Sequence, residues 1–423
     1  MDKYSSYKDS GVQWLGQVPS HWEMKRFRFL LTENAKLNTD LKERTQLQFR
    51  YGEIIRKANQ SEDSDVLKAI QKYTVVAPGD IMINGLNLNY DFITQRVAQV
   101  QEPGVITSAY ISLRPATGVN SKYYTYFMKA MDAQKMFHGM GSGVRLTLAY
   151  ANLKNMFFPY PSLAEQEAMV AYLDAATAKI DEAITQQQQM IEHLKERKRV
   201  LISHIVTRGV KRDPELKDSG IDYLGNIPSD WSVVALRFIG TIIKDIVDPK
   251  LFPGAVFKEY SMPSFDEGRT PSTVLADNLD SSKFSISGPT LLVNKLNVHK
   301  ERIWFISDPG SNAVASTEFV PIRIHSANPR FVEYAMLNHF VTEHLICSSN
   351  GATNSQKRVS PDSIAKLKLP IPSDVEQKKI VDYLDNAIKP INNAIYTCDE
   401  IISRLDERKR IIINDVVTGK IKV

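Results

Sequence analysis

The chain contains two diverged copies of one sequence pattern, and this internal repeat constrains its fold more than any single motif. The pattern KDSG…LG…PS.W at residues 8–22 returns at residues 217–231. The pattern P-x-P-S…EQ…YLD at residues 159–174 returns at residues 370–385. Between these blocks, the motif Asn-x-Leu-Asn occurs once in each copy. A repeat of this length predicts two modules with the same fold, joined in tandem.

The two copies differ in one internal region. Residues 39–72 are polar and charged, whereas residues 248–283 are interrupted by Pro253, Gly254 and Pro271, among others. No alignment connects these two stretches, which are called the private inserts below. Each copy therefore combines a repeated frame with a private insert. This arrangement is expected of two similar modules that recognise different things.

A long helix is predicted at the end of each copy. Residues 165–207 contain neither proline nor glycine, and apolar side chains recur in alternating steps of three and four in both copies. This heptad pattern is typical of a coiled coil. Pro390 is expected to kink or interrupt the second helix near its first turns. The predicted coiled-coil core consists of Leu173, Ile180, Ile184, Ile191, Leu194, Leu201, Leu384, Ile391, Ile395, Ile402, Leu405 and Ile412.

The lengths of these segments predict how the two modules are arranged. A helix of about 43 residues is about 65 Å long, and only a short connection follows it before the second module begins. The second helix must then run back beside the first, so we expect an antiparallel pair with one module at each end and a pseudo-twofold axis between them. Strand-like runs alternate with short helical stretches inside each copy, which predicts α+β modules. The expected boundaries are residues 1–163 and 209–375 for the modules, and residues 164–208 and 376–423 for the helices.

Composition sets broad limits on the class of protein. The net charge is +5 and the pI is about 8.8, which is compatible with nucleic-acid binding but equally with an ordinary solvated surface. The two cysteines are too few for a disulfide framework or a thiolate zinc site. The first residues lack the apolar region of a signal peptide, and no apolar run is long enough to span a membrane. We therefore expect a soluble cytoplasmic protein without membrane contact.

No catalytic or metal site is predicted. The segment Asn328-Pro329-Arg330-Phe331 is close to the N-P-P-aromatic motif of amino-methyltransferases, but Arg330 replaces the second proline. The glycines at residues 139–143 follow a helical stretch instead of opening one, which is the wrong context for a methyl-donor loop. The nuclease-like spacing of residues 376–378 lacks a suitably placed acidic partner. We therefore expect the chain itself not to be an enzyme.

Candidate DNA contacts lie in two places of each copy. Glycine lets the backbone approach phosphate, Arg and Lys neutralise phosphate, and Asn or Gln read adenine edges. The ordinary alternatives are flexible loops and hairpin turns, which favour Asn for backbone reasons alone. The residues expected to contact DNA are Arg145, Asn354, Gln356, Lys357 and Arg358 in the glycine-rich loops, and Asn84, Asn87, Asn294, Lys295, Asn297 and His299 in or after the Asn-x-Leu-Asn turns, with Lys300 and Arg302 extending the latter.

Basic clusters at residues 195–199 and 406–410 occupy matching places on the two predicted helices. Such a run is usually a solvated helix face with pairs of opposite charge one turn apart. Its recurrence in both copies leaves open a second interpretation, in which the clusters dock a partner or bind phosphate.

Taken together, these blocks resemble the specificity subunits of type I restriction-modification systems over essentially the whole chain. The resemblance rests on the twin openings, the Asn-x-Leu-Asn turns, the P-x-P-S…EQ…YLD blocks and the helix ends at residues 205–207 and 416–420. It implies two target-recognition domains that each read one half of an asymmetric site in double-stranded DNA, with the helices setting the spacing.

The resemblance also implies the partners. Two methyltransferase subunits would dock on the helical regions, and restriction subunits would join the full complex. S-adenosylmethionine for adenine methylation would bind the methyltransferase, while ATP and Mg would bind the restriction partner. No cofactor is expected on this chain.

Two other functions remain open from the sequence. One is the recognition part of a self-contained restriction enzyme, against which the lack of a catalytic motif argues. The other is a coiled-coil scaffold without DNA reading, which leaves the private inserts unexplained. The target bases do not follow from the sequence.

Overall fold

The computed structural model describes residues 2–50, 52–58, 60, 63–90, 92, 95–144, 146–349 and 357–423. The chain forms two compact units, residues 1–187 with 400–423 and residues 188–399. Each unit thus contains one module together with one end of each long helix. The expected four-part division gave the helices to separate domains. That division stays a prediction. The compact units include the helix ends because these bury apolar side chains in the module cores, as Leu173 and Val416 do in the first unit.

A four-stranded antiparallel sheet forms the frame of the first module. Its strand order is β4-β11-β8-β9. Side chains alternate across β8, so that Ile81 and Ile83 face one core and Met82 faces another. The helix α3 contributes Phe127 to the same core as Ile81 and Ile83. The bounds are β4 Leu31–Glu33, β8 Ile81–Ile83, β9 Val97–Gln99, β11 Ile111–Pro115 and α3 Ser121–Ala133.

The second module repeats this frame. Its sheet has the order β16-β24-β21-β22, and β21 alternates in the same way, with Leu291 and Val293 in one core and Leu292 in another. The alternation of strands and short helices expected from the sequence is confirmed, and two short helices, α8 and α9, follow β24. The bounds are β16 Gly240–Ile242, β21 Thr290–Asn294, β22 Ile303–Ile306, β24 Phe319–Ile324, α8 Pro329–Met336 and α9 His339–Cys347.

The private inserts cover the second face of each sheet and have different folds. The first forms the hairpin β5–β6 and the helix α2, and its Leu47 and Ile54 pack against Met82. The second contributes to a five-stranded sheet of order β17-β20-β23-β18-β19, in which β18 and β23 are parallel. The bounds are β5 Leu47–Arg50, β6 Glu53–Arg56, α2 Ser64–Ile70, β7 Thr74–Val76, β10 Gly104–Ile106, β17 Ile246–Val247, β18 Val256–Tyr260, α7 Met262–Asp266, β19 Ser272–Leu275, β20 Lys283–Ser285 and β23 Ala313–Ser316.

The repeated openings form matching small structures. In each, a two-stranded hairpin precedes a buried tryptophan, Trp22 or Trp231. The indole N–H of Trp22 donates to Glu165 at 3.3 Å, and that of Trp231 donates to Glu376 at 3.1 Å. The next strand of each opening pairs with the strand before the long helix. The bounds are β1 Tyr7–Asp9, β2 Gln17–Pro19, β3 Glu23–Arg26, α1 Phe27–Leu30, α4 Tyr150–Leu153, β12 Phe157–Tyr160, β13 Leu216–Asp218, β14 Asn226–Pro228, β15 Ser232–Ala235, α6 Leu236–Ile239, α10 Pro361–Lys366 and β25 Lys368–Ile371.

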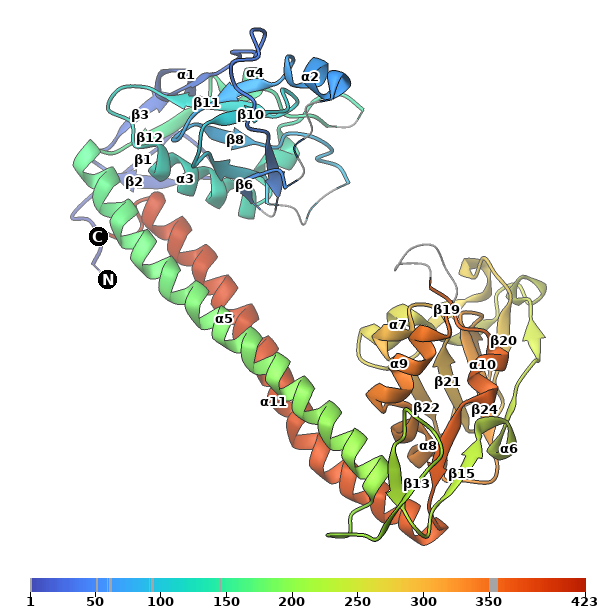
Figure 1. Ribbon diagram of the computed structural model, residues 1–423. Helices are drawn as coiled ribbons and strands as arrows, with labels where there is room; N and C mark the ends of the chain where they lie inside the picture. The colour runs from blue at the N-terminus through green and yellow to red at the C-terminus, as the bar shows by residue number, and fades with distance from the viewer. Residues whose placement is uncertain are drawn as a thin grey trace. The chain divides into compact units, whose positions relative to one another are not determined.

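Two long helices, α5 Leu163–Arg208 and α11 Asp374–Val417, run side by side (Figure 1). They are antiparallel within each unit, because the start of α5 packs with the end of α11 in the first core, and the reverse holds in the second. Of the predicted core positions, Leu173, Ile180, Ile191, Leu384 and Ile391 are buried, whereas Ile184, Leu194, Leu201, Ile395, Ile402, Leu405 and Ile412 are half-buried. No helix in the described part of the chain is long and apolar enough to cross a membrane.

The expected interruption at Pro390 is wrong. The helix α11 continues through this residue from Asp374 to Val417. A proline removes the hydrogen bond to the carbonyl of Asn386, one turn earlier. Both residues are exposed, so water can solvate that carbonyl. The buried neighbours Ile388 and Ile391 hold the apolar face of this turn in place.

Each module is attached to its long helix by the same set of contacts. In the first unit, Lys122 and the hydroxyl of Tyr126 on α3 bind Asp174 of α5 at 2.7 and 2.8 Å. In the second, Arg330 and the hydroxyl of Tyr334 on α8 bind Asp385 of α11. These aspartates end the two YLD blocks.

The tyrosines act as hydrogen-bond donors in this attachment. Burial, together with the neighbouring Asp174 carboxylate, raises the pKa of Tyr126 to about 12, although a hydrogen bond with Thr177 opposes the shift. The phenol therefore stays protonated at neutral pH and donates to the carboxylate. Burial and Asp385 raise the pKa of Tyr334 in the same direction.

Candidate nucleic-acid interface

The Asn-x-Leu-Asn turns have the same conformation in both units. The side-chain oxygen of Asn84 accepts from the N–H of Leu86 at 3.2 Å, and that of Asn294 accepts from the N–H of Leu296 at 2.9 Å. The last residue of each turn, Asn87 or Asn297, has a positive φ of 53° or 56°. Asparagine tolerates this left-handed conformation better than most residues.

The structure brings each turn together with the glycine-rich loop of the same copy. In the first unit, the N–H of Leu148 donates to the carbonyl of Gly85 at 2.9 Å. In the second, the N–H of Val359 donates to the carbonyl of Lys295, also at 2.9 Å. The sequence placed these candidate segments more than fifty residues apart and gave no sign that they pair. The combined surface of turn and loop is called the turn–loop edge below.

Close packing explains one glycine of the first turn–loop edge. A side chain at Gly141 would come within 2.8 Å of Leu88 and 2.9 Å of the backbone of Leu146. On the same edge Asn87 is exposed, and the side-chain amide of Asn89 donates to the carbonyl of Val144 at 3.4 Å. Arg145, a predicted contact, lies outside the described residues.

The first edge also exposes apolar side chains that the sequence did not single out. Val144 is 94% exposed, Tyr90 is 74% exposed and Phe92 is 54% exposed. The ring of Phe92 stacks on His138 at 4.7 Å. The aromatic residues directly after the turn were the signal in the sequence that could have indicated this surface.

The second turn–loop edge is basic. Arg358 and His299 are exposed, while Lys295, Asn297 and Lys357 are half-buried. A pocket of about 260 Å³ lies here, lined by His299, Lys357, Val298, Ile346 and Ser349. Asn354 and Gln356 lie outside the described residues.

Arg358 has an acidic neighbour on this edge. Its guanidinium lies 2.8 Å from the carboxylate of Glu318, whose side chain is 24% exposed. The contact holds the guanidinium at the surface. An anion that binds Arg358 must therefore compete with Glu318 or share the guanidinium with it.

Two of the predicted contacts serve the fold. Asn294 is only 2% exposed, and its amide groups are used within its own turn. This matches the backbone role that the sequence left open. Arg302 is 7% exposed and forms an ion pair with Asp266 of the private insert, which lowers the pKa of that carboxyl group. Its charge is therefore directed into the module and away from the turn–loop edge.

The segments that resembled catalytic motifs have structural roles. The side chain of Asn328 accepts from the N–H groups of Arg330 and Phe331 and so caps α8, as Asn120 caps α3. Gln377 is buried and joins the backbone of Pro372 to that of Asn328. In the described part of the chain, no three His, Cys, Asp or Glu side chains are grouped to hold a metal ion.

The basic clusters on the long helices are divided between two faces. Lys195 and Arg199 form ion pairs with Glu192 and Glu196, one turn earlier on the same helix. Lys198 turns inward and donates to Asn392 of α11 at 2.9 Å. Its counterpart Lys409 binds Asp181 of α5 at 2.6 Å. These lysines therefore join the two helices, and the outer residues pair locally.

Comparisons with known proteins agree on one family. A family model for the type I restriction modification DNA specificity domain matches residues 89–193 and 256–397, which is more than half of the chain. The chain is 23% identical over 379 residues to the type I restriction enzyme MjaVIII specificity subunit of Methanocaldococcus jannaschii, covering 85% of this chain and 83% of that subunit.

Two further relatives extend this comparison. The type I restriction enzyme StySPI specificity subunit of Salmonella potsdam is 23% identical over 301 residues, which cover 67% of this chain and 63% of that subunit. A solved chain from work on the complex assembly and conformational transition of the type I R-M system has a TM-score of 0.65 at 14% identity, covering 96% of this chain and 99% of that chain. This last likeness confirms the fold.

Proposed function

Because the chain belongs to the family of type I restriction-modification specificity subunits, we propose that it reads a two-part DNA site with its two turn–loop edges and private inserts. Each module reads one half of the site. The chain performs no chemistry itself and directs partner subunits to the DNA.

The observation that carries this proposal is the pairing of a constant frame with variable surfaces. The Leu148–Gly85 and Val359–Lys295 backbone bonds are equivalent in the two units. The side chains displayed beside them differ, being apolar and aromatic in the first unit and basic in the second. The inserts packed behind the two sheets also differ in fold. Equivalent backbones with different side chains fit two related targets with different base sequences.

The partners supply the catalytic groups in this proposal. Two methyltransferase subunits, one for each repeat, bind S-adenosylmethionine and methylate adenine. Restriction subunits that bind ATP and Mg join the full complex. The long helices α5 and α11 fix the number of unspecified base pairs between the half-sites. The scaffold alternative gives no role to the equivalent turn–loop edges, and the self-contained enzyme alternative requires a catalytic site on this chain.

Methylome sequencing tests this function. A strain without other adenine methyltransferases receives this chain and the methyltransferase of its own system, and methylated positions are mapped across the genome. We expect one asymmetric two-part motif with a constant gap. The chain alone and the methyltransferase alone are the controls, and both should leave the genome unmethylated.

Exchange of one private insert makes the test specific. Replacing residues 248–283 with the insert of a relative should change one half of the motif and leave the other half and the gap unchanged. Unmethylated DNA in the strain with both wild-type proteins would contradict the proposed function. A change in both half-sites would contradict the modular assignment.

A further inference from the structure

Both modules expose an arginine and a phenylalanine at the same place in the repeated frame. On α1, the guanidinium carbon of Arg28 lies 5.0 Å from the ring centre of Phe29. On α6, that of Arg237 lies 4.9 Å from the ring centre of Phe238. The two pairs are called the Arg–Phe pairs. The two pairs have the same geometry.

Packing within the module does not account for these phenylalanines. Phe29 is 61% exposed and Phe238 is 63% exposed, whereas Phe27 and Leu236, two residues earlier, are buried. The buried residues hold each short helix in the core, so the fold does not require an aromatic ring outside. A single exposed phenylalanine is common at protein surfaces, but here it recurs beside an arginine at the same place in both copies.

Each Arg–Phe pair lies beside the element that follows the glycine-rich loop. The N–H of Phe27 donates to the carbonyl of Met156 at 2.8 Å, and the N–H of Leu236 donates to the equivalent Leu367 at 2.8 Å. These bonds place α1 next to the end of α4, and α6 next to the end of α10. The Arg–Phe pairs are therefore fixed to the segments that follow the glycine-rich loops in both units.

Basic side chains lie near both pairs, although Glu33 and Asp362 also lie close by. In the first unit, exposed Lys154 and Arg26 lie on the neighbouring segments, and Arg26 stacks on the half-exposed ring of Phe157. In the second unit, Lys366 and Lys368 are exposed, and Lys366 forms an ion pair with Asp362. An exposed aromatic ring with basic side chains around it complements a protein surface in which acidic side chains border an apolar pocket.

We propose that the two Arg–Phe pairs are equivalent docking sites for the methyltransferase subunits, one subunit on each module, in addition to the helical regions that the resemblance implies. This inference rests on the proposed function, which supplies the partner. Arginine and aromatic residues are the side chains most enriched at the energetic centres of protein interfaces. A site with the same chemistry in both modules fits a partner that binds twice in the same way. DNA would present a different base sequence to each module.

DNA is the less favoured occupant of these surfaces. Phosphate contacts require the arginine and leave the phenylalanine in water. Stacking of the ring on a base requires that base to be unpaired. A protein partner uses both side chains at once.

Binding of the methyltransferase without DNA tests the inference. The full chain and the methyltransferase subunit of the same system are mixed, the mass of the complex is measured, and the affinity is obtained by titration. The variants Phe29→Ala and Phe238→Ala should each weaken one of two sites by about tenfold or more, because truncation of a central aromatic residue typically has this effect. The double variant should lose both methyltransferases at concentrations that saturate the wild type.

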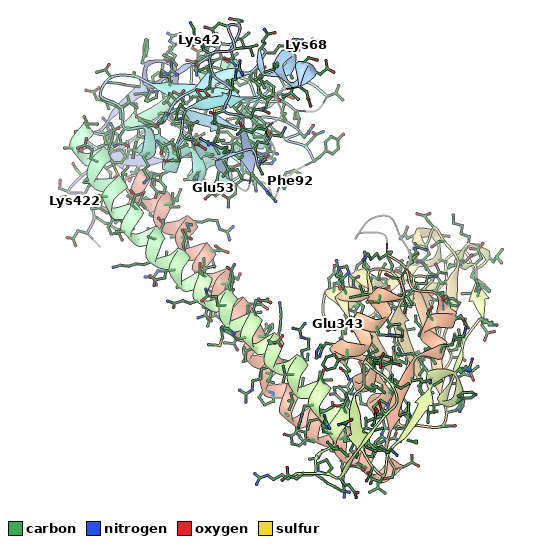
Figure 2. The ribbon with its side chains drawn as sticks, viewed as in Figure 1. Lys42, Glu53, Lys68, Phe92, Glu343 and Lys422 are labelled. Carbon is green, nitrogen blue, oxygen red and sulfur yellow. The ribbon has the colours of Figure 1, made fainter. Side chains whose placement is uncertain are left out.

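Phe340→Ala is the matched control, because Phe340 is an exposed phenylalanine on α9, the helix on which Figure 2 labels Glu343, and it lies outside the Arg–Phe pairs and the turn–loop edges. It should bind two methyltransferases with wild-type affinity. The charge reversals Arg28→Glu and Arg237→Glu provide a second test of the same sites, because they change the charge and leave the phenylalanine rings in place. They should weaken the same sites.

The outcomes separate the two proposals. Two sites of wild-type affinity in the Phe29→Ala, Phe238→Ala double variant would overturn the docking assignment while leaving the proposed function intact. Normal methyltransferase binding with loss of DNA affinity would assign the Arg–Phe pairs to DNA and also overturn it. A wild-type chain that binds no methyltransferase would contradict the proposed function itself.

Discussion

The asparagines of the two turns have different roles at neighbouring positions. Asn84 and Asn294 use their side chains to close the turn. Asn87 and Asn297 supply the left-handed backbone, and the side chain of Asn87 is exposed. The sequence predicted the turn and its residues but could not separate these roles. Both roles favour the same residue type, and only burial distinguishes them.

The basic residues of the second turn–loop edge lead to a prediction about how DNA affinity depends on salt concentration. We expect Lys357→Ala to weaken DNA binding and to reduce the slope of log affinity against log salt by about one unit, because one phosphate contact releases nearly one counterion. Adding Arg358→Ala should reduce the slope further, by less than a second full unit, because Arg358 already shares its charge with Glu318. Affinity is measured by titration at several salt concentrations.

Lys379→Ala is the control, because Lys379 is exposed on α11 away from the turn–loop edge. It should leave both affinity and slope unchanged. Wild-type affinity and slope in the Lys357→Ala, Arg358→Ala variant would show that this edge does not contact DNA.

Among the elements, the long helices were the most predictable and the private inserts the least. A heptad pattern indicates which face of a helix is buried. The middle positions, such as Ile184 and Ile402, are half-buried, as expected where two helices pack on each other without a third element covering them. The inserts contain short strands whose partners lie far along the chain, as β18 and β23 do. Local sequence specifies no such pairing, and the joining of turn to glycine-rich loop was unpredictable for the same reason.

The helix α11 carries a prediction about stability. Replacing Pro390 with alanine restores the N–H that the carbonyl of Asn386 lacks, and we expect stabilisation of roughly 1–3 kcal/mol. Thermal unfolding followed by circular dichroism should show a midpoint a few degrees above that of the wild type. Lys389→Ala, an exposed neighbouring change that leaves the backbone bonding intact, should not shift the midpoint. A lower midpoint for Pro390→Ala would mean that the proline geometry is needed for packing.

For the whole molecule, one continuous helix of 46 residues enters both units. We expect four residues inserted between Ile184 and Leu194, with four more between Ile395 and Leu405, to lengthen both helices by about 6 Å. Four residues nearly preserve the helical phase, so the heptad stripe should survive with local unwinding. Since DNA rises about 3.4 Å per base pair, the gap in the methylated motif should grow by one or two base pairs.

Methylome sequencing measures this change, and the half-site sequences should stay the same. The control replaces the same segments with other heptad sequences of unchanged length, which should leave the gap as it was. An active complex with lengthened helices and an unchanged gap would show that the helices do not measure the DNA.

The private inserts pack on the face of each sheet that is turned away from the long helices. Leu47 and Ile54 share a cluster with Met82 of the frame, and Tyr260 shares another with Leu292, and both clusters are separate from those that join the frame to the long helices. Genetic recombination that exchanged the coding sequence of an insert between related genes would therefore leave the packing of the long helices undisturbed. Under the proposed function, such an exchange would give the complex a new half-site in one event.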